Sequence, residues 1–133
     1  MKANAIWKSE MLFDATSHSG HTVLFDGDPA HTHGASPMEV VLMGLCGYTA
    51  IDVISILRKK REPFTGLSVS AEAEQAAEPP KVFTQVRLVY RVSGAVSHKA
   101  MEDAVRLSET KYCSVAGMVC KTAHIEYVIE YVD

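Results

Sequence analysis

Apolar and polar residues alternate in short runs along the first part of this 133-residue chain. Residues 2–8, 12–16 and 21–25 show partial alternation, so each run predicts a β-strand. The pair Ser19-Gly20 predicts a turn between the second and third strands. Residues 26–36 contain Gly, Pro, Asp and Ser without periodicity, and they predict a loop.

Alternation returns in the second half, where residues 67–74, 82–92 and 124–132 predict three more strands. One face of the first strand carries Leu67, Val69, Ala71 and Ala73, and one face of the last carries Ile125, Tyr127, Ile129 and Tyr131. The expected core face of the middle strand carries Val82, Thr84, Val86, Leu88, Tyr90 and Val92. Helical spacing of apolar residues predicts a helix capped by Ser97, and residues 114–120 predict a shorter one.

Ser36-Pro37-Met38-Glu39 has the pattern of a helix start, with a serine cap, a proline at the first helical position and a glutamate completing a capping box. The helix is expected to run to about residues 57–61, where a run of lysines and arginines suits its C-terminal end. Between residues 40 and 57 the only charged residue is Asp52.

A helix that is apolar on nearly all sides must be enclosed on nearly all sides. One sheet from this chain covers one face, so we expect a second copy to cover the other, giving a homodimer. Strands grouped before helices favour an α+β fold with antiparallel sheets around this helix, in a single domain over residues 1–133. Residues 40–57 also reach the length of a membrane span, but Asp52 and the flanking strand patterns favour no membrane.

Composition narrows the class of protein. The chain is 47% hydrophobic and 22% charged, which excludes a disordered protein. Thirteen Lys and Arg against sixteen Asp and Glu give no basic excess, so nucleic acid is not expected as a partner. Three cysteines and no signal-peptide pattern favour a reducing, cytoplasmic location.

Two cysteines are candidates for catalysis. Cys113 precedes the short predicted helix, where a helix N-terminus would lower the pKa of its thiol. Cys46 lies about two and a half turns into the long helix, too deep for that effect. The alternative is that Cys46, Cys113 and Cys120 are small buried apolar residues.

Asp52 is a carboxylate among apolar residues and therefore needs a partner, with Tyr48 and Ser55 at helical spacing from it. It is either a structural hydrogen-bond centre or a functional group, and we favour the first. Glu39 is already explained by the capping box. The histidines at 18, 21, 31 and 33 lack a zinc-ligand spacing, so neither a metal nor another cofactor is expected.

The segments ASPMEVVLMGLCGYTAIDVISILRKKR and SETKYCSVAGMV resemble the OsmC-like family, the osmotically inducible protein C and organic hydroperoxide resistance group. The resemblance spans nearly the whole chain and implies an intertwined α+β homodimer with sites at its interface. In active members a cysteine of the long helix attacks the peroxide, and a second cysteine, matched here by Cys113, resolves the sulfenic acid as a disulfide.

The sequence departs from that family pattern at the attacking position. The family cysteine lies eleven residues after the helix proline, where this chain has Tyr48, and Cys46 stands two residues earlier. Two residues correspond to about 200° around a helix, so Cys46 should point nearly the other way. Active members of the family also use an arginine from the N-terminal part and a glutamate just after the helix proline. Here residues 9–57 contain no arginine, and Met38 follows Pro37, so Glu39 stands one position late.

Three hypotheses follow. The first, slightly favoured, is thiol-dependent reduction of organic hydroperoxides in oxidative-stress defence, with Cys113 and a displaced Cys46. The second is an inactive family member that binds a small apolar ligand at the dimer interface through Tyr48, Asp52 and Glu39. The third is a purely structural dimer.

Overall fold

The structure is a computed structural model that describes all of residues 1–133. The chain divides into two compact units, Met1–Val41 and Leu42–Asp133, each of which is described by itself. The predicted single domain over residues 1–133 spans both units and stays a prediction.

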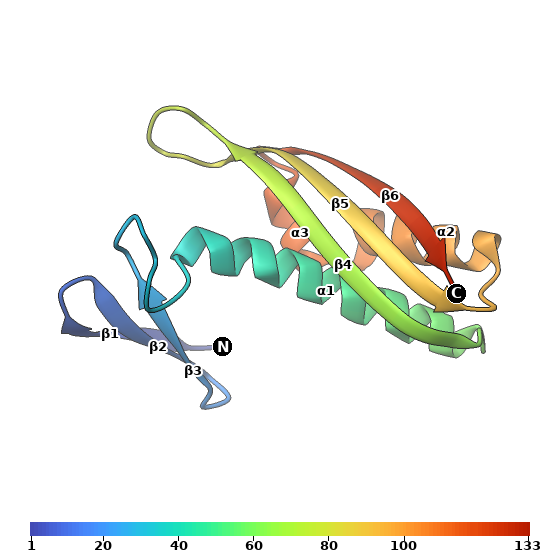
Figure 1. Cartoon of the computed structure of the whole chain (residues 1–133), viewed down its shortest axis with the longest axis horizontal. Coiled ribbons are helices and arrows are strands. Elements are labelled where there is room, and N and C mark those ends of the chain that lie inside the picture. Colours follow the sequence, from blue (N-terminus) through green and yellow to red (C-terminus); the bar gives the residue numbers. More distant parts are fainter. The chain divides into compact units, whose positions relative to one another are not determined.

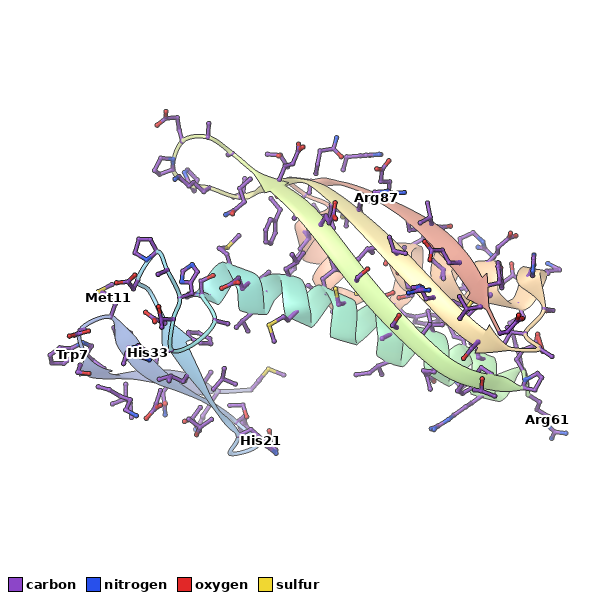
Figure 2. The ribbon with its side chains drawn as sticks, in the orientation of Figure 1. Trp7, Met11, His21, His33, Arg61 and Arg87 are labelled. Atoms are coloured by element: carbon purple, nitrogen blue, oxygen red, sulfur yellow. The ribbon has the colours of Figure 1, made fainter.

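The first unit holds a three-stranded antiparallel sheet, in the order β1 (Ala3–Ser9), β2 (Leu12–Ser17) and β3 (Thr22–Asp26). All three strands were predicted to within one or two residues. The sheet exposes several large apolar side chains, among them Trp7 on β1 and Met11 in the β1–β2 turn (Figure 2). Asp26, the last residue of β3, organises the loop that follows. Its carboxylate accepts hydrogen bonds from the backbone N–H groups of Asp28 and His33.

Helix α1 (Pro37–Lys59) begins at the predicted capping box. The Ser36 hydroxyl accepts the Glu39 N–H at 3.1 Å, and the Glu39 carboxylate accepts the Ser36 N–H at 2.8 Å. These reciprocal bonds satisfy two backbone donors that the first helical turn leaves free. Arg58 and Lys59 occupy the last turn, where cations are favourable.

The second unit contains a sheet in the order β4 (Phe64–Gln75), β5 (Phe83–Gly94) and β6 (His124–Val132). Between β5 and β6 lie α2 (His98–Leu107), the π-helix η1 (Ser108–Tyr112) and α3 (Ser114–Val119). Pairing of β4 with β5 is antiparallel, as predicted, whereas β5 and β6 are parallel. The expectation of antiparallel sheets was wrong here. The helical connection returns the chain to the end of the sheet at which β5 begins, so β6 runs in the same direction as β5.

Helices lie on one face of this sheet (Figure 1), and the core of the second unit lies between them and the sheet. Val86, Leu88, Tyr90 and Val92 of β5 are buried there, as are Leu45, Thr49, Val53 and Leu57 of α1. The predicted face fails at the start of β5, where Phe83 is buried and Thr84 is exposed. A bulge opposite Gln75 shifts the register at this point and reverses the alternation. The other face is polar and carries the ion pairs Arg87–Glu126 and Arg91–Glu130.

Much of the surface of α1 is apolar and uncovered within one chain. Met43 is 61% exposed and Ile51 is 70% exposed. By length and composition α1 could cross a bilayer, with 22% of its most apolar window buried. A helix that covers a sheet on one side and a second protein chain on the other has the same composition, so these two properties do not establish a membrane span.

Candidate functional site

A chain of buried hydroxyl groups joins two carboxylates between α1, β5 and η1. Thr49 stands in the middle, with its Oγ1 at 2.7 Å from the Tyr90 hydroxyl and at 2.7 Å from Ser108 Oγ. At one end the Tyr90 hydroxyl meets Glu109 Oε1 at 2.8 Å. At the other end Ser108 Oγ meets Asp52 Oδ2 at 3.0 Å. We call these five residues the hydroxyl chain.

The elements explain this convergence. Thr49 and Asp52 are three residues apart on α1 and so lie on neighbouring parts of its surface. Tyr90 projects from the buried face of β5. Ser108 and Glu109 are the first two residues of η1, a π-helical turn of the kind often found at functional sites.

Burial shifts the titration of this cluster. The pKa of the Glu109 carboxyl lies above its usual range because burial disfavours its charge, and the negative charge of Asp52 adds to the effect. The pKa of the Tyr90 phenol is raised by its burial and by the adjacent Glu109.

Tyr48 points toward the start of α3. Its hydroxyl accepts a hydrogen bond from Ser114 Oγ at 3.1 Å, and Ser114 is the residue after Cys113. The position eleven residues after Pro37 therefore faces the region of the second family cysteine, but it presents a phenol there.

Cys113 is the N-cap of α3, and its Sγ accepts the Ala116 N–H at 3.3 Å. The expected lowering of its pKa was wrong. Burial raises the pKa of the thiol, which is 5% exposed, and the charges of Glu109 and Asp52 raise it further. These effects outweigh the helix N–H groups that stabilise a thiolate, so Cys113 is mainly a neutral thiol near neutral pH.

Cys46 and Cys120 do not join this cluster by any hydrogen bond. Cys46 is half-buried on α1, about 200° around the helix from Tyr48, and burial raises the pKa of its thiol. Cys120 follows α3, is exposed and donates to the Gly117 carbonyl at 3.4 Å. All three cysteines are free thiols.

A cavity of about 410 Å³ opens beside the hydroxyl chain. We call it the Tyr48 pocket. Its walls combine two tyrosine rings, aliphatic side chains, two lysines and the Asp52 carboxylate: Tyr48, Asp52, Ser55, Ile56, Lys59, Lys60, Leu107 and Tyr112. Lys60 also pairs with Asp103 at 3.8 Å. Such a mixture of apolar walls and a few polar groups is typical of small-molecule sites.

The remaining candidate residues lie in the first unit. Glu39 completes the capping box, and the donated Ser36 N–H holds its pKa below the usual range. His21 precedes β3 and hydrogen-bonds Ser19 through its ring, whereas His33 lies in the loop after β3 (Figure 2). The His31 ring is hydrogen-bonded to the backbone carbonyl of Asp26.

The sequence proposed Tyr48, Asp52 and Cys113 as candidate site residues, and the structure places all three around the start of α3 and η1. The sequence did not single out their neighbours Thr49, Tyr90, Ser108, Glu109 and Ser114 as candidates. The one available signal was Thr49, a further polar residue close to Asp52 in an apolar helix. Nothing in the sequence indicated its partners, because Ser108 and Tyr90 are distant along the chain and η1 has no sequence signature.

Comparison with known proteins places this chain in a family. A sequence model of the OsmC-like protein family matches residues 27–128. The chain belongs to the OsmC-like family, as its resemblance to that family implied. Protein YhfA of Escherichia coli strain K12 is 40% identical over 133 residues, covering 99% of this chain and 98% of YhfA.

Solved structures share the fold. A hypothetical protein from Aquifex aeolicus VF5 is 27% identical with a TM-score of 0.85, covering 99% of this chain and 97% of that one. An organic hydroperoxide resistance protein OsmC from Legionella pneumophila is 14% identical with a TM-score of 0.74, covering 97% and 95%. At that identity the likeness concerns the fold alone. The α+β architecture with a long central helix is therefore confirmed.

Proposed function

We propose that this chain is an OsmC-like protein that binds a small, largely apolar molecule in the Tyr48 pocket and does not run a two-cysteine peroxidase cycle. The observation that carries the proposal is the Tyr48–Ser114 hydrogen bond of 3.1 Å. It sets a phenol at the start of α3, where two-cysteine chemistry requires a thiol.

The cysteines support the same conclusion. A direct disulfide requires two Cα atoms within about 7 Å and Cβ atoms that face each other. The side of α1 that faces the start of α3 carries Tyr48, and Cys46 points nearly the other way. The pKa values of Cys46 and Cys113 are both raised by burial, so neither thiol is activated for attack.

Ligand binding can be tested with anilinonaphthalene sulfonate, a fluorescent probe with apolar rings and an anionic group that suits the lysines. We expect saturable binding of one probe per chain. Tyr112→Ala should weaken the binding by about tenfold, a loss of roughly 1.4 kcal/mol. Tyr131→Ala removes a tyrosine outside the pocket and should leave the affinity unchanged. Equal affinities in both variants and the wild type would reject the Tyr48 pocket as the binding site.

A second candidate is hydroperoxide reduction by Cys113, favoured by the hydrogen bond from the Ala116 N–H to its sulfur. This chemistry would consume an organic hydroperoxide in the presence of a dithiol, and Cys113→Ser would abolish the consumption. We expect no consumption above the protein-free rate. Turnover that is lost in Cys113→Ser would establish the reductase and reject our preference.

We also propose that the chain is a homodimer in which a second copy covers the exposed face of α1. Met43 and Ile51 are large, apolar and mostly exposed on this helix. Contact of such apolar side chains with water is unfavourable by about 25 cal/mol per Å². Sedimentation equilibrium should give twice the chain mass for the wild type and for Val128→Glu, which changes the polar sheet face. Ile51→Glu should give the mass of one chain, and a monomeric wild type would contradict the dimer.

A further inference from the structure

We infer that the hydroxyl chain stores one proton beyond those of its three hydroxyls and passes it between Glu109, where it rests, and Asp52, which opens on the Tyr48 pocket. Its use toward a bound molecule rests on the proposed ligand site. The storage itself is a property of the ligand-free protein.

The hydroxyl chain has more oxygen–oxygen contacts than hydroxyl protons. The hydroxyl chain has four oxygen–oxygen contacts: Asp52 with Ser108, Ser108 with Thr49, Thr49 with Tyr90, and Tyr90 with Glu109. The contacts measure 3.0, 2.7, 2.7 and 2.8 Å in that order. Each is a hydrogen-bond distance, at which two oxygens without an intervening proton repel one another. Three hydroxyls supply only three protons.

Thr49 is the residue at which the shortage appears. It is fully buried and contacts two hydroxyl oxygens, yet it has one proton to donate. One neighbour, Tyr90 or Ser108, must therefore donate toward Thr49. That neighbour no longer donates to its own carboxylate, so the carboxyl group must carry the fourth proton and donate it.

With four protons, two arrangements satisfy every contact. In the first, protonated Glu109 donates to Tyr90, Tyr90 to Thr49, Thr49 to Ser108, and Ser108 to ionised Asp52. In the second, protonated Asp52 donates to Ser108 and every bond points the opposite way. Each of the four protons crosses one contact between these states, and the net change is one proton moved from Glu109 to Asp52.

The surroundings favour Glu109 as the resting position. Four groups face its carboxyl: Asp52 and the Thr49 hydroxyl from α1, the Tyr90 phenol from β5 and the Cys113 thiol at the start of α3. None of them supplies a positive charge, and burial raises the pKa of Glu109 by more than the hydrogen bonds of Tyr90 and Thr49 lower it. Asp52 borders the Tyr48 pocket, whose wall also includes Lys59 and Lys60. Asp52 is thus the end at which a proton can enter or leave toward a molecule in the pocket.

The test follows the NMR chemical shift of the Glu109 carboxyl carbon against pH in the ligand-free protein, which gives the midpoint of the carboxyl titration. Glu109→Gln is used to assign the signal. Thr49→Val replaces the hydroxyl by a methyl group of similar size. Tyr90 and Ser108 can then donate to their own carboxylates, so the fourth proton is no longer required. We expect the midpoint to fall by about one pH unit or more, a tenfold change in proton affinity.

Two further variants separate the hydroxyl from general effects on structure. Thr49→Ser restores the hydroxyl and should restore the wild-type midpoint, and Thr84→Val, an exposed threonine of β5, should leave it unchanged. Ser108→Ala interrupts the chain at another point and should lower the midpoint as Thr49→Val does. The inference is overturned if Thr49→Val and Ser108→Ala both have the midpoint of the wild type. It is also overturned if Thr49→Ser has the midpoint of Thr49→Val. Neither result depends on whether the Tyr48 pocket binds a ligand.

Discussion

Tyr90→Phe removes one buried hydroxyl from the hydroxyl chain without leaving a large cavity. The Tyr90 side chain is fully buried, and its hydroxyl contacts Thr49 at 2.7 Å and Glu109 at 2.8 Å. In the resting state inferred above, Glu109 carries a proton, so both lost bonds join neutral groups, each worth about 1 kcal/mol net. The expected loss of unfolding free energy is therefore about 2 kcal/mol, or roughly 6–8 °C in melting temperature for a chain of this length.

The loss should grow with pH. The pKa of Glu109 is raised in the folded protein, so the stability that its protonated form contributes is present at acid pH and disappears as pH rises through the folded pKa. The Tyr90 hydrogen bond favours the ionised carboxyl, so its removal raises the pKa of Glu109 further. Above the wild-type midpoint, the variant must then bury a carboxylate that has lost this donor.

Urea denaturation followed by far-ultraviolet circular dichroism measures both effects. Wild type and variant should be compared at one protein concentration, because a dimer gains apparent stability with concentration. A loss below about 0.5 kcal/mol at neutral pH would mean that the hydroxyl makes no net contribution. A loss of unfolding free energy that shrinks as pH rises would contradict the inference that Glu109 carries a proton.

Three other predictions use the same denaturation assay. Ser36→Ala should reduce stability by about 1 kcal/mol through loss of the cap, and an unchanged midpoint would contradict the reciprocal bonds with Glu39. Gly94→Ala should reduce it by roughly 2–4 kcal/mol, because φ is 101° and a Cβ would collide with the Pro63 carbonyl. Gly20→Ala, where φ is 89° but space is open, should lose only about 1 kcal/mol, and equal losses would exclude the collision. Glu109→Gln should gain stability relative to wild type as pH rises, since an amide cannot ionise, and a constant difference would contradict the raised pKa of Glu109.

The strands and helices were predictable because their signals are local. The capping box set the start of α1 at Pro37, and alternation located β4 and β5 to within a few residues. The errors occur where tertiary structure decides. The bulge opposite Gln75 buries Phe83 in place of Thr84, and the direction of β6 depends on the path of the helices before it.

The site was predictable only in part. Asp52 could be identified because a lone carboxylate in an apolar helix requires a partner, and Cys113 and Tyr48 stood out through the family pattern. The partner of Asp52 proved to be Ser108, not Tyr48 or Ser55. Long-range pairs such as Thr49 with Tyr90 leave no mark in the sequence, since each residue alone fits an ordinary helix or strand.

Our central proposal is that this chain does not form a disulfide in response to a hydroperoxide, because Tyr48 stands where a two-cysteine cycle requires a thiol. Counting thiols by mass spectrometry after one equivalent of cumene hydroperoxide tests this proposal most directly. In a two-cysteine cycle, the hydroperoxide is reduced to alcohol and water while two thiols lose their hydrogens and form one disulfide. We predict that the wild type retains all three free thiols, whereas Tyr48→Cys loses two to a disulfide that includes Cys113. Formation of a Cys46–Cys113 disulfide in the wild type would contradict the account.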